Sequence, residues 1–182
     1  SPIAAAGLQS YFDFIVAVNG SDKIETLEEF AGYISQFLNQ EVTLTVFSTK
    51  HNNVRELTLR PNTNWSSNPK DGMLGCSVRY SSIAKGLENV WHILEIQPRS
   101  PAERAGLQPQ TDYVVGCDAQ TMEQENDFYD LIASHEGKVL SLLVYNTEWD
   151  NCREVILIPK AGWGGQGSLG CGVGYGLLHR VP

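Results

Sequence analysis

Apolar and polar residues alternate along the chain with two different periods. Near residues 27–38 and 128–132 the apolar positions recur at helical spacing, which predicts one main helix in each half of the chain. Shorter runs, rich in β-branched residues and partly alternating, predict strands. The expected strands cover residues 14–18, 42–47, 54–60, 90–96, 113–116, 139–145 and 154–158, with one more strand in each of the segments 72–80 and 167–175. The pattern therefore predicts a mainly β protein with short helices, in the α+β class.

The same succession of motifs occurs twice along the chain. Ser-Pro-x-x-x-Ala-Gly-Leu at residues 1–8 returns at 100–107, where serine can cap a short helix that proline begins. Leu-Gly-Cys at residues 74–76 returns at 169–171, and several unlike motifs between these two recur in the same order. Two such copies predict two small domains rather than a solenoid, which needs shorter and more numerous units.

We expect the first domain to cover residues 1–83 and the second to cover 84–182, each with a sheet of about five strands. Only the second has a strand, at 90–96, just ahead of its Ser-Pro motif. We therefore expect the first domain to lack its opening strand in this chain, either because this copy has lost it or because of an N-terminal truncation. The strand expected at 76–82 would then have an unpaired edge. Such an edge is a template for another chain, and we expect a neighbouring molecule to pair with it.

Composition and charge narrow the range of functions. The 182 residues carry a formal charge of −8, from 13 basic and 21 acidic residues, which does not attract a nucleic-acid backbone. No apolar run is long enough to span a bilayer. The histidines follow no metal-binding spacing and no nucleophile motif occurs, so we expect no catalysis, no metal and no cofactor. The cysteines form no C-x-x-C pair, and we expect reduced structural thiols at Cys76, Cys117, Cys152 and Cys171.

A glycine-rich loop precedes the last predicted strand. Gly-Gly-Gln-Gly at residues 164–167 has neither the Lys-Ser/Thr of a P-loop nor the G-x-G-x-x-G spacing. Glycines allow successive backbone N–H groups to point into one concavity, which binds an anion. Beside an open strand edge and a helix, that anion can be the C-terminal carboxylate of a peptide that adds itself to the sheet.

The combination of Leu-Gly-x at the head of a strand with a facing helix resembles a PDZ domain. Over essentially all 182 residues the chain also resembles one family, the Golgi reassembly-stacking (GRASP) proteins. The most specific matching motifs lie at residues 89–92, 145–147, 150–156, 163–172 and 174–182. In the first repeat, Gly-Met at 72–73 replaces the family's frequent Gly-Gly-Gln-Gly loop and residues 66–71 are longer and polar. The sequence leaves the shape of the first carboxylate loop open.

The resemblance implies two tandem, circularly permuted PDZ-like domains with a peptide-binding groove in each. For groove 1 we expect the residues Leu27, Phe30, Ile34, Leu74, Gly75, Cys76, Ser77, Val78 and Tyr80. For groove 2 we expect the residues Phe128, Leu131, Ile132, Leu169, Gly170, Cys171 and Gly172. We further expect that a charged residue in place of Ile34 abolishes peptide binding and leaves the fold intact.

The family also implies a function. It implies an adaptor at the cytoplasmic face of the Golgi membrane, which binds the C-terminal tails of golgin-like coiled-coil proteins and self-associates to link membranes. A role in unconventional secretion is implied as well, and so is an N-terminal lipid anchor, which we expect to lie outside this chain. Two alternatives stay open: a peptide-sensing PDZ pair that regulates a protease, and a structural self-assembly domain without a peptide ligand.

Overall fold

The computed structural model describes residues 1–182, which divide into two compact units, residues 1–83 (unit 1) and 84–182 (unit 2). Each unit is built mainly from antiparallel strands with a few short helices, so the predicted fold class is confirmed. None of the helices is both long and apolar enough to cross a membrane.

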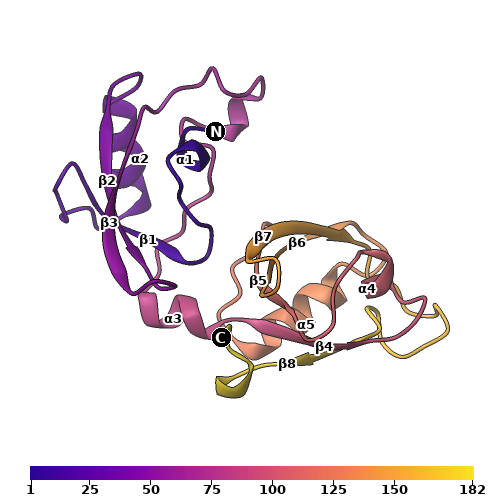
Figure 1. The fold of residues 1–182 in the computed structure, drawn as a ribbon. Helices are drawn as coiled ribbons and strands as arrows, with labels where there is room; N and C mark the ends of the chain where they lie inside the picture. Colours follow the sequence, from indigo (N-terminus) through magenta and orange to yellow (C-terminus); the bar gives the residue numbers. More distant parts are fainter. The chain divides into compact units, whose positions relative to one another are not determined.

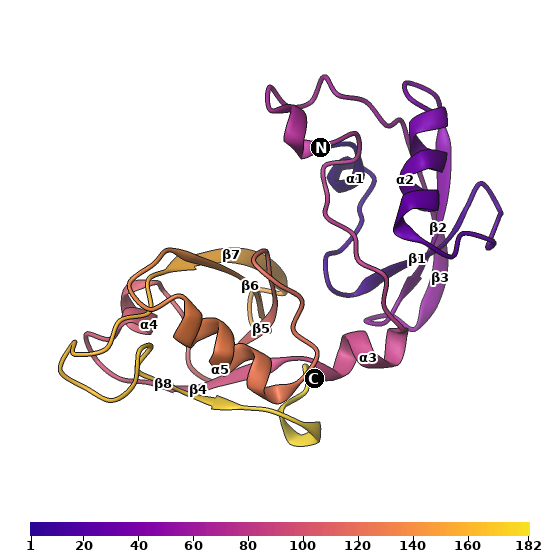
Figure 2. The same ribbon diagram turned by 180° about the vertical axis from the view of Figure 1, so that it is seen from behind.

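Unit 1 contains a three-stranded antiparallel sheet in the order β1-β2-β3, with α2 against it (Figures 1 and 2). Strand β2 alternates strictly between buried and half-buried residues, as expected for a strand with one face on the core. Its elements are α1 (Pro2–Ala5), β1 (Asp13–Val18), α2 (Leu27–Gln36), β2 (Val42–Ser48), β3 (Asn53–Leu59) and the short η1 (Pro69–Asp71), and α3 (Ile83–Glu88) begins at its last residue.

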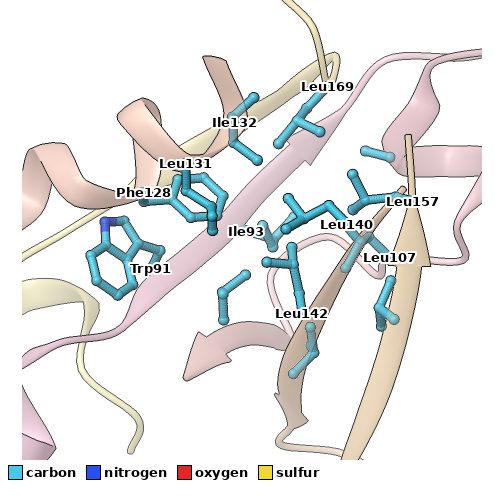
Figure 3. Packing of buried hydrophobic residues seen from close by; sticks show 14 of the residues in the cluster. Trp91, Ile93, Leu107, Phe128, Leu131, Ile132, Leu140, Leu142, Leu157 and Leu169 are labelled. Carbon is cyan, nitrogen blue, oxygen red and sulfur yellow. The ribbon is translucent and has the colours of Figure 1, made fainter. Parts of the chain in front are cut away.

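Unit 2 contains a five-stranded sheet in the order β7-β6-β5-β4-β8, and α5 runs beside β4 and β8 in both ribbon views. Its largest buried side chains come from α5 and β4, and Figure 3 shows Phe128, Leu131 and Ile132 pointing from α5 toward β4. Its elements are β4 (Trp91–Ile96), α4 (Pro101–Arg104), β5 (Asp112–Cys117), α5 (Glu125–Ser134), β6 (Leu140–Asn146), β7 (Asn151–Leu157), β8 (Cys171–Gly174) and η2 (Leu177–His179).

The Ser-Pro motifs form the predicted capped helices. The Ser1 hydroxyl accepts a hydrogen bond from the Ala4 N–H at 3.4 Å, and the Ser100 hydroxyl accepts one from the Glu103 N–H at 3.1 Å. Both prolines occupy the first helical position, where a missing N–H costs nothing. The two units therefore begin these segments with the same local structure.

The prediction of a strand at residues 76–82 is wrong, and unit 1 has three strands rather than about five. In unit 2, the matching strand β8 pairs with β4 alone. The described part of unit 1 contains no counterpart of β4, so the segment after Gly75 has no neighbour to pair with. A strand is stabilised by cross-strand pairs and not by its own backbone. That a neighbouring molecule pairs with this segment stays a prediction.

Candidate peptide-binding grooves

The loop before β8 is shaped by a glycine that packs on a tryptophan. Gly170 has a left-handed backbone with φ of +71°, and an added Cβ would meet the Trp163 ring and the Ser100 side chain. The Trp163 indole N–H donates a hydrogen bond of 2.9 Å to the Gly167 carbonyl. Only glycine combines this conformation with so close an approach.

The loop of unit 1 has the same construction despite its different sequence. Gly75 has φ of +78°, and an added Cβ would lie 2.8 Å from the ring of Trp65. The Trp65 indole N–H donates to the Gly72 carbonyl at 3.1 Å, as Trp163 does in unit 2. The question that the sequence left open is thus answered: the polar segment 66–71 leaves the shape of the Leu-Gly-Cys loop unchanged.

Each loop is also held by the short helix that follows the Ser-Pro motif. The Ile3 N–H donates to the Leu74 carbonyl at 3.1 Å, and the Ala102 N–H donates to the Leu169 carbonyl at 2.9 Å. Several backbone N–H groups of the two loops have no hydrogen-bond acceptor. Within residues 1–182 no acceptor is found for the N–H groups of Leu74, Gly75, Leu169 and Gly170. Such a row of open donors suits an anion.

Strand β8 presents an open edge beside this loop. It lies at the end of the sheet order, with β4 as its sole neighbour. The Gln97 N–H donates to the Gly170 carbonyl at 2.8 Å, so Gly170 directs its carbonyl toward β4. The backbone N–H and C=O groups of successive residues point to alternate sides of a strand. Those of Cys171 and Val173 therefore point to the open side of β8. A peptide can therefore add itself to β8 as a further strand.

The structure places the predicted helix residues at two depths. Ile34, Phe128 and Leu131 are wholly or almost wholly buried, Ile132 is buried as well, and Phe30 is half-buried. Leu27 is 40% exposed at the first position of α2. The buried residues hold the helices on their sheets, so a wall that a peptide could touch must come from other positions.

Exposed positions that could form such a wall lie on one flank of each helix, here called the free flank. In α2 the free flank carries Leu27 and, one turn later, the exposed Ala31, and in α5 the same positions hold Glu125 and Tyr129. On the other flank of α2, Tyr33 lines a shallow cavity of about 420 Å³ together with Lys23 and Ile24 of the preceding loop. Ala31, Glu125 and Tyr129 were not among the residues expected from the sequence, because helical periodicity marks the buried stripe and not the flank beside it.

The predicted strand residues differ between the two units. Leu74 and Leu169 are buried in their cores, and Cys76, Cys171 and Gly172 are half-buried. Ser77, Val78 and Tyr80 are exposed and belong to no strand. Groove 2 is thus bounded by a strand and a helix, whereas in groove 1 the residues after Cys76 have no strand partner.

Glu136, just after α5, ties the second loop to the helix. Its carboxylate accepts a hydrogen bond of 2.6 Å from the Ser168 hydroxyl and another of 2.6 Å from the Ala161 N–H. These two bonds lower the pKa of the Glu136 carboxyl. In unit 1 the repeat places Leu38 at this position, which cannot accept such bonds. The second loop therefore has two anchors that the first loop lacks.

The cysteines beside the loops are free thiols in apolar surroundings. Burial raises the pKa of the Cys171 thiol to about 11 and also raises that of Cys76. A thiol with a raised pKa carries almost no thiolate at neutral pH, and the thiolate is the nucleophile and the metal ligand. Residues 1–182 contain no group of three His, Cys, Asp or Glu side chains that could hold a metal ion.

Comparisons with known proteins agree with this geometry. The family model described as GRASP55/65 PDZ-like domain matches residues 1–76 and again residues 66–182. Golgi reassembly-stacking protein 1 of Homo sapiens and that of Mus musculus are each 47% identical over 182 residues, which is all of this chain and 40% of theirs. An uncharacterized protein of Schizosaccharomyces pombe is 39% identical over 177 residues, covering 97% of this chain and 49% of that protein. The chain thus spans less than half the length of these relatives, and it belongs to the GRASP55/65 family of PDZ-like domain proteins.

Proposed function

We propose that this chain is the peptide-binding part of a Golgi-associated adaptor, which binds C-terminal tails of partner proteins and self-associates to link membranes. The mammalian relatives carry the name Golgi reassembly-stacking protein, which supports a role at the Golgi. The observation that carries the proposal is the Leu-Gly-Cys loop, built twice on a tryptophan with its N–H groups unused.

In the proposed complex the peptide lies antiparallel to β8. Its terminal carboxylate accepts hydrogen bonds from the N–H groups of Leu169, Gly170 and Cys171. Its backbone pairs with the open side of Cys171 and Val173, and its side chains face the free flank of α5. Backbone pairing supplies affinity for any extended tail, and the flank of the helix supplies specificity.

Both predicted grooves remain part of the proposal, with different weight on their residues. The loop residues Leu74, Gly75 and Cys76 in groove 1, and Leu169, Gly170, Cys171 and Gly172 in groove 2, are proposed to contact the peptide. Ser77, Val78 and Tyr80 are proposed to contact the peptide once the segment 76–80 is paired with another strand. The proposed role of the buried helix residues is to support the walls.

The proposed partners are golgin-like coiled-coil proteins and further copies of this chain, at the cytoplasmic face of the Golgi membrane. We place no catalytic step on the chain. The strongest competing function is a structural self-assembly domain whose grooves take no ligand. A regulatory domain pair of a protease would also bind C-terminal peptides, but the family match does not point to it.

Calorimetry with the full chain tests the proposal. The probe is a seven-residue peptide of Ala and Ser that ends in isoleucine with a free carboxylate, and the control is the same peptide with a C-terminal amide. We expect the free acid to bind and the amide to bind at least about tenfold more weakly, because the loop N–H groups need a charged acceptor. Self-association without any peptide binding would contradict the proposal and favour the structural domain.

A further inference from the structure

A carboxylate and an aromatic ring lie one helical turn apart on the free flank of α5. Glu125 is exposed, and its carboxylate makes no hydrogen bond or ion pair within the chain. Tyr129 is 46% exposed and contacts Phe128 edge to face. Asp127, the next acidic residue of α5, is committed to the start of the helix, because its carboxylate accepts hydrogen bonds from the N–H groups of Glu123 and Gln124.

The orientation of α5 brings Glu125 to the far end of β8. The Trp91 indole N–H donates to the Glu125 carbonyl at 3.1 Å, and the Trp91 ring lies 5.4 Å from the ring of Tyr175, the residue after β8. Burial raises the pKa of the Tyr175 phenol, and among nearby carboxylates that of Glu125 raises it most. At the other end, Glu136 holds the Leu-Gly-Cys loop. Helix and strand thus run in opposite directions.

The opposite directions of α5 and β8 determine which residue of a bound tail lies near Glu125. With the terminal carboxylate on the loop, the residue paired with Cys171 is at or near the C-terminus, and the residue paired with Val173 is two positions upstream. The next pairing position reaches Tyr175. The side chain near Glu125 therefore belongs to a residue two to four positions before the C-terminal residue.

The electrostatic surroundings of this site are negative. Residues 84–182 contain 7 Lys and Arg and 13 Asp and Glu, a formal charge of −6 out of the −8 of the whole chain. The segment 118–130, which includes the first half of α5, contains five acidic residues and no basic one. Arg180 is already paired with Glu88 at 2.9 Å. In unit 1 the corresponding flank of α2 carries Leu27 and Ala31 instead.

We propose that groove 2 selects C-terminal tails that carry Lys or Arg two to four residues before the C-terminal residue, and that Glu125 and Tyr129 recognise this cation. The Glu125 carboxylate neutralises the charge, and the Tyr129 ring offers its negative face to an ammonium or guanidinium group. Groove 1, with Leu27 and Ala31 at these positions, has no such preference. This inference rests on the proposed function.

NMR titration of the full chain tests the specificity. The probes are the seven-residue Ala/Ser peptides ending in isoleucine, with Lys, Ala or Glu placed in turn at each of the three upstream positions. The amide signals of Cys171 and Val173 report groove 2, and those of Cys76 and Ser77 report groove 1. At groove 2 we expect the best Lys peptide to bind about fivefold more tightly than the Ala peptide and the Glu peptide more weakly, with the difference shrinking in high salt. At groove 1 the three should bind alike.

Variants separate this inference from the proposed function. Glu125→Gln should bring the ratio of Lys to Ala affinities to about one, and Glu125→Lys should make the Glu peptide the tightest. Asp130→Asn removes one charge from the exposed outer face of the same helix, away from Glu125, and should leave the ratio unchanged. Equal binding of the Lys, Ala and Glu peptides at Cys171 and Val173 would overturn the inference and leave the proposed function standing. Peptides that shift neither set of amides, as free acid or as amide, would overturn both.

Discussion

The Trp163 ring lies so close to Gly170 that an added Cβ would come within 2.5 Å of the ring carbon Cζ2. Trp65 has the same relation to Gly75 in the other unit, at 2.8 Å. Two loops of different length and sequence thus reach one conformation by packing a glycine on an indole. The side chain fixes the loop, and the glycine leaves the loop N–H groups open.

Gly170→Ala should therefore destabilise unit 2 and weaken peptide binding at groove 2. The new methyl group meets the ring and the Ser100 side chain, in addition to the strain of a positive φ. Gly137→Ala is the matched control, because Gly137 has a similar φ of +73° and open space around its Cβ position. We expect the control to cost about 1–2 kcal/mol and Gly170→Ala to cost about 1–3 kcal/mol more, measured by chemical denaturation. Equal costs would show that the ring does not restrict this position.

Trp163→Phe should loosen the loop without emptying the space under it. Phenylalanine keeps an aromatic ring but cannot donate to the Gly167 carbonyl. We expect a loss of about 0.5–1.5 kcal/mol of stability and weaker peptide binding in calorimetry. The expectation fails if binding is unchanged, since the indole N–H would then play no part in arranging the donors.

Removing one partner of a buried ion pair should cost far more stability than breaking an exposed pair in the same unit. The wholly buried Asp112 carboxylate accepts hydrogen bonds from the Arg153 guanidinium at 2.9 and 2.6 Å and from the Asn146 amide at 2.7 Å. Asp112→Ala leaves these donors unpaired and should cost about 3–5 kcal/mol. Glu88→Gln, which breaks the exposed pair with Arg180, should cost less than about 1 kcal/mol. Thermal unfolding of both variants measures the contrast, and similar losses would refute it.

Local patterns in the sequence account for most of the fold. Strand β2 is predicted by its own residues, because the buried Val42, Leu44 and Val46 alternate with half-buried residues. The capped helices α1 and α4 also follow from adjacent residues alone. The internal repeat, rather than any single motif, indicated two units, which share the succession from α1 to β3 and from α4 to β7.

What the sequence could not predict depends on partners that are distant in the chain. Residues 76–80 resemble 171–175, yet only the second segment contains a strand, because β4 lies beside it. Which residues of α5 stay exposed beside β8 depends on how the helix packs on the sheet, and periodicity alone marks only the buried stripe around Phe128. The groove wall at Glu125 therefore became visible only in three dimensions.

Alkaline pH should destabilise unit 2 through Cys171. Burial raises the pKa of this thiol from its ordinary value near 9 to about 11, so the folded state holds the proton more tightly than the unfolded state. The protonated thiol therefore contributes on the order of 2 kcal/mol to the free energy of unfolding. This contribution is fully present below about pH 9 and is lost as the pH rises through 11. The Tyr145 phenol, with its pKa raised to about 12 mainly by burial, adds a later loss. Denaturation midpoints at pH 8 and pH 10.5 should differ clearly less in Cys171→Ala than in the parent chain, and an equal difference would exclude this cause.

Two substitutions on α2 should separate the wall of groove 1 from its core. The sequence suggested that a charge at Ile34 would block binding and spare the fold, but Ile34 is only 2% exposed within the core of unit 1. A charged residue there has no partner and should unfold unit 1.

Leu27→Lys changes a 40% exposed residue on the free flank and should leave the circular dichroism spectrum and the unfolding midpoint nearly unchanged. It should still weaken the binding of a tail with an apolar side chain at groove 1, because burying such a side chain against Leu27 contributes up to about 1.5–3 kcal/mol. NMR shifts at Cys76 and Ser77 during peptide titration measure this loss. If Leu27→Lys binds as the parent chain does, the peptide does not contact this flank of α2, and groove 1 lies elsewhere on unit 1.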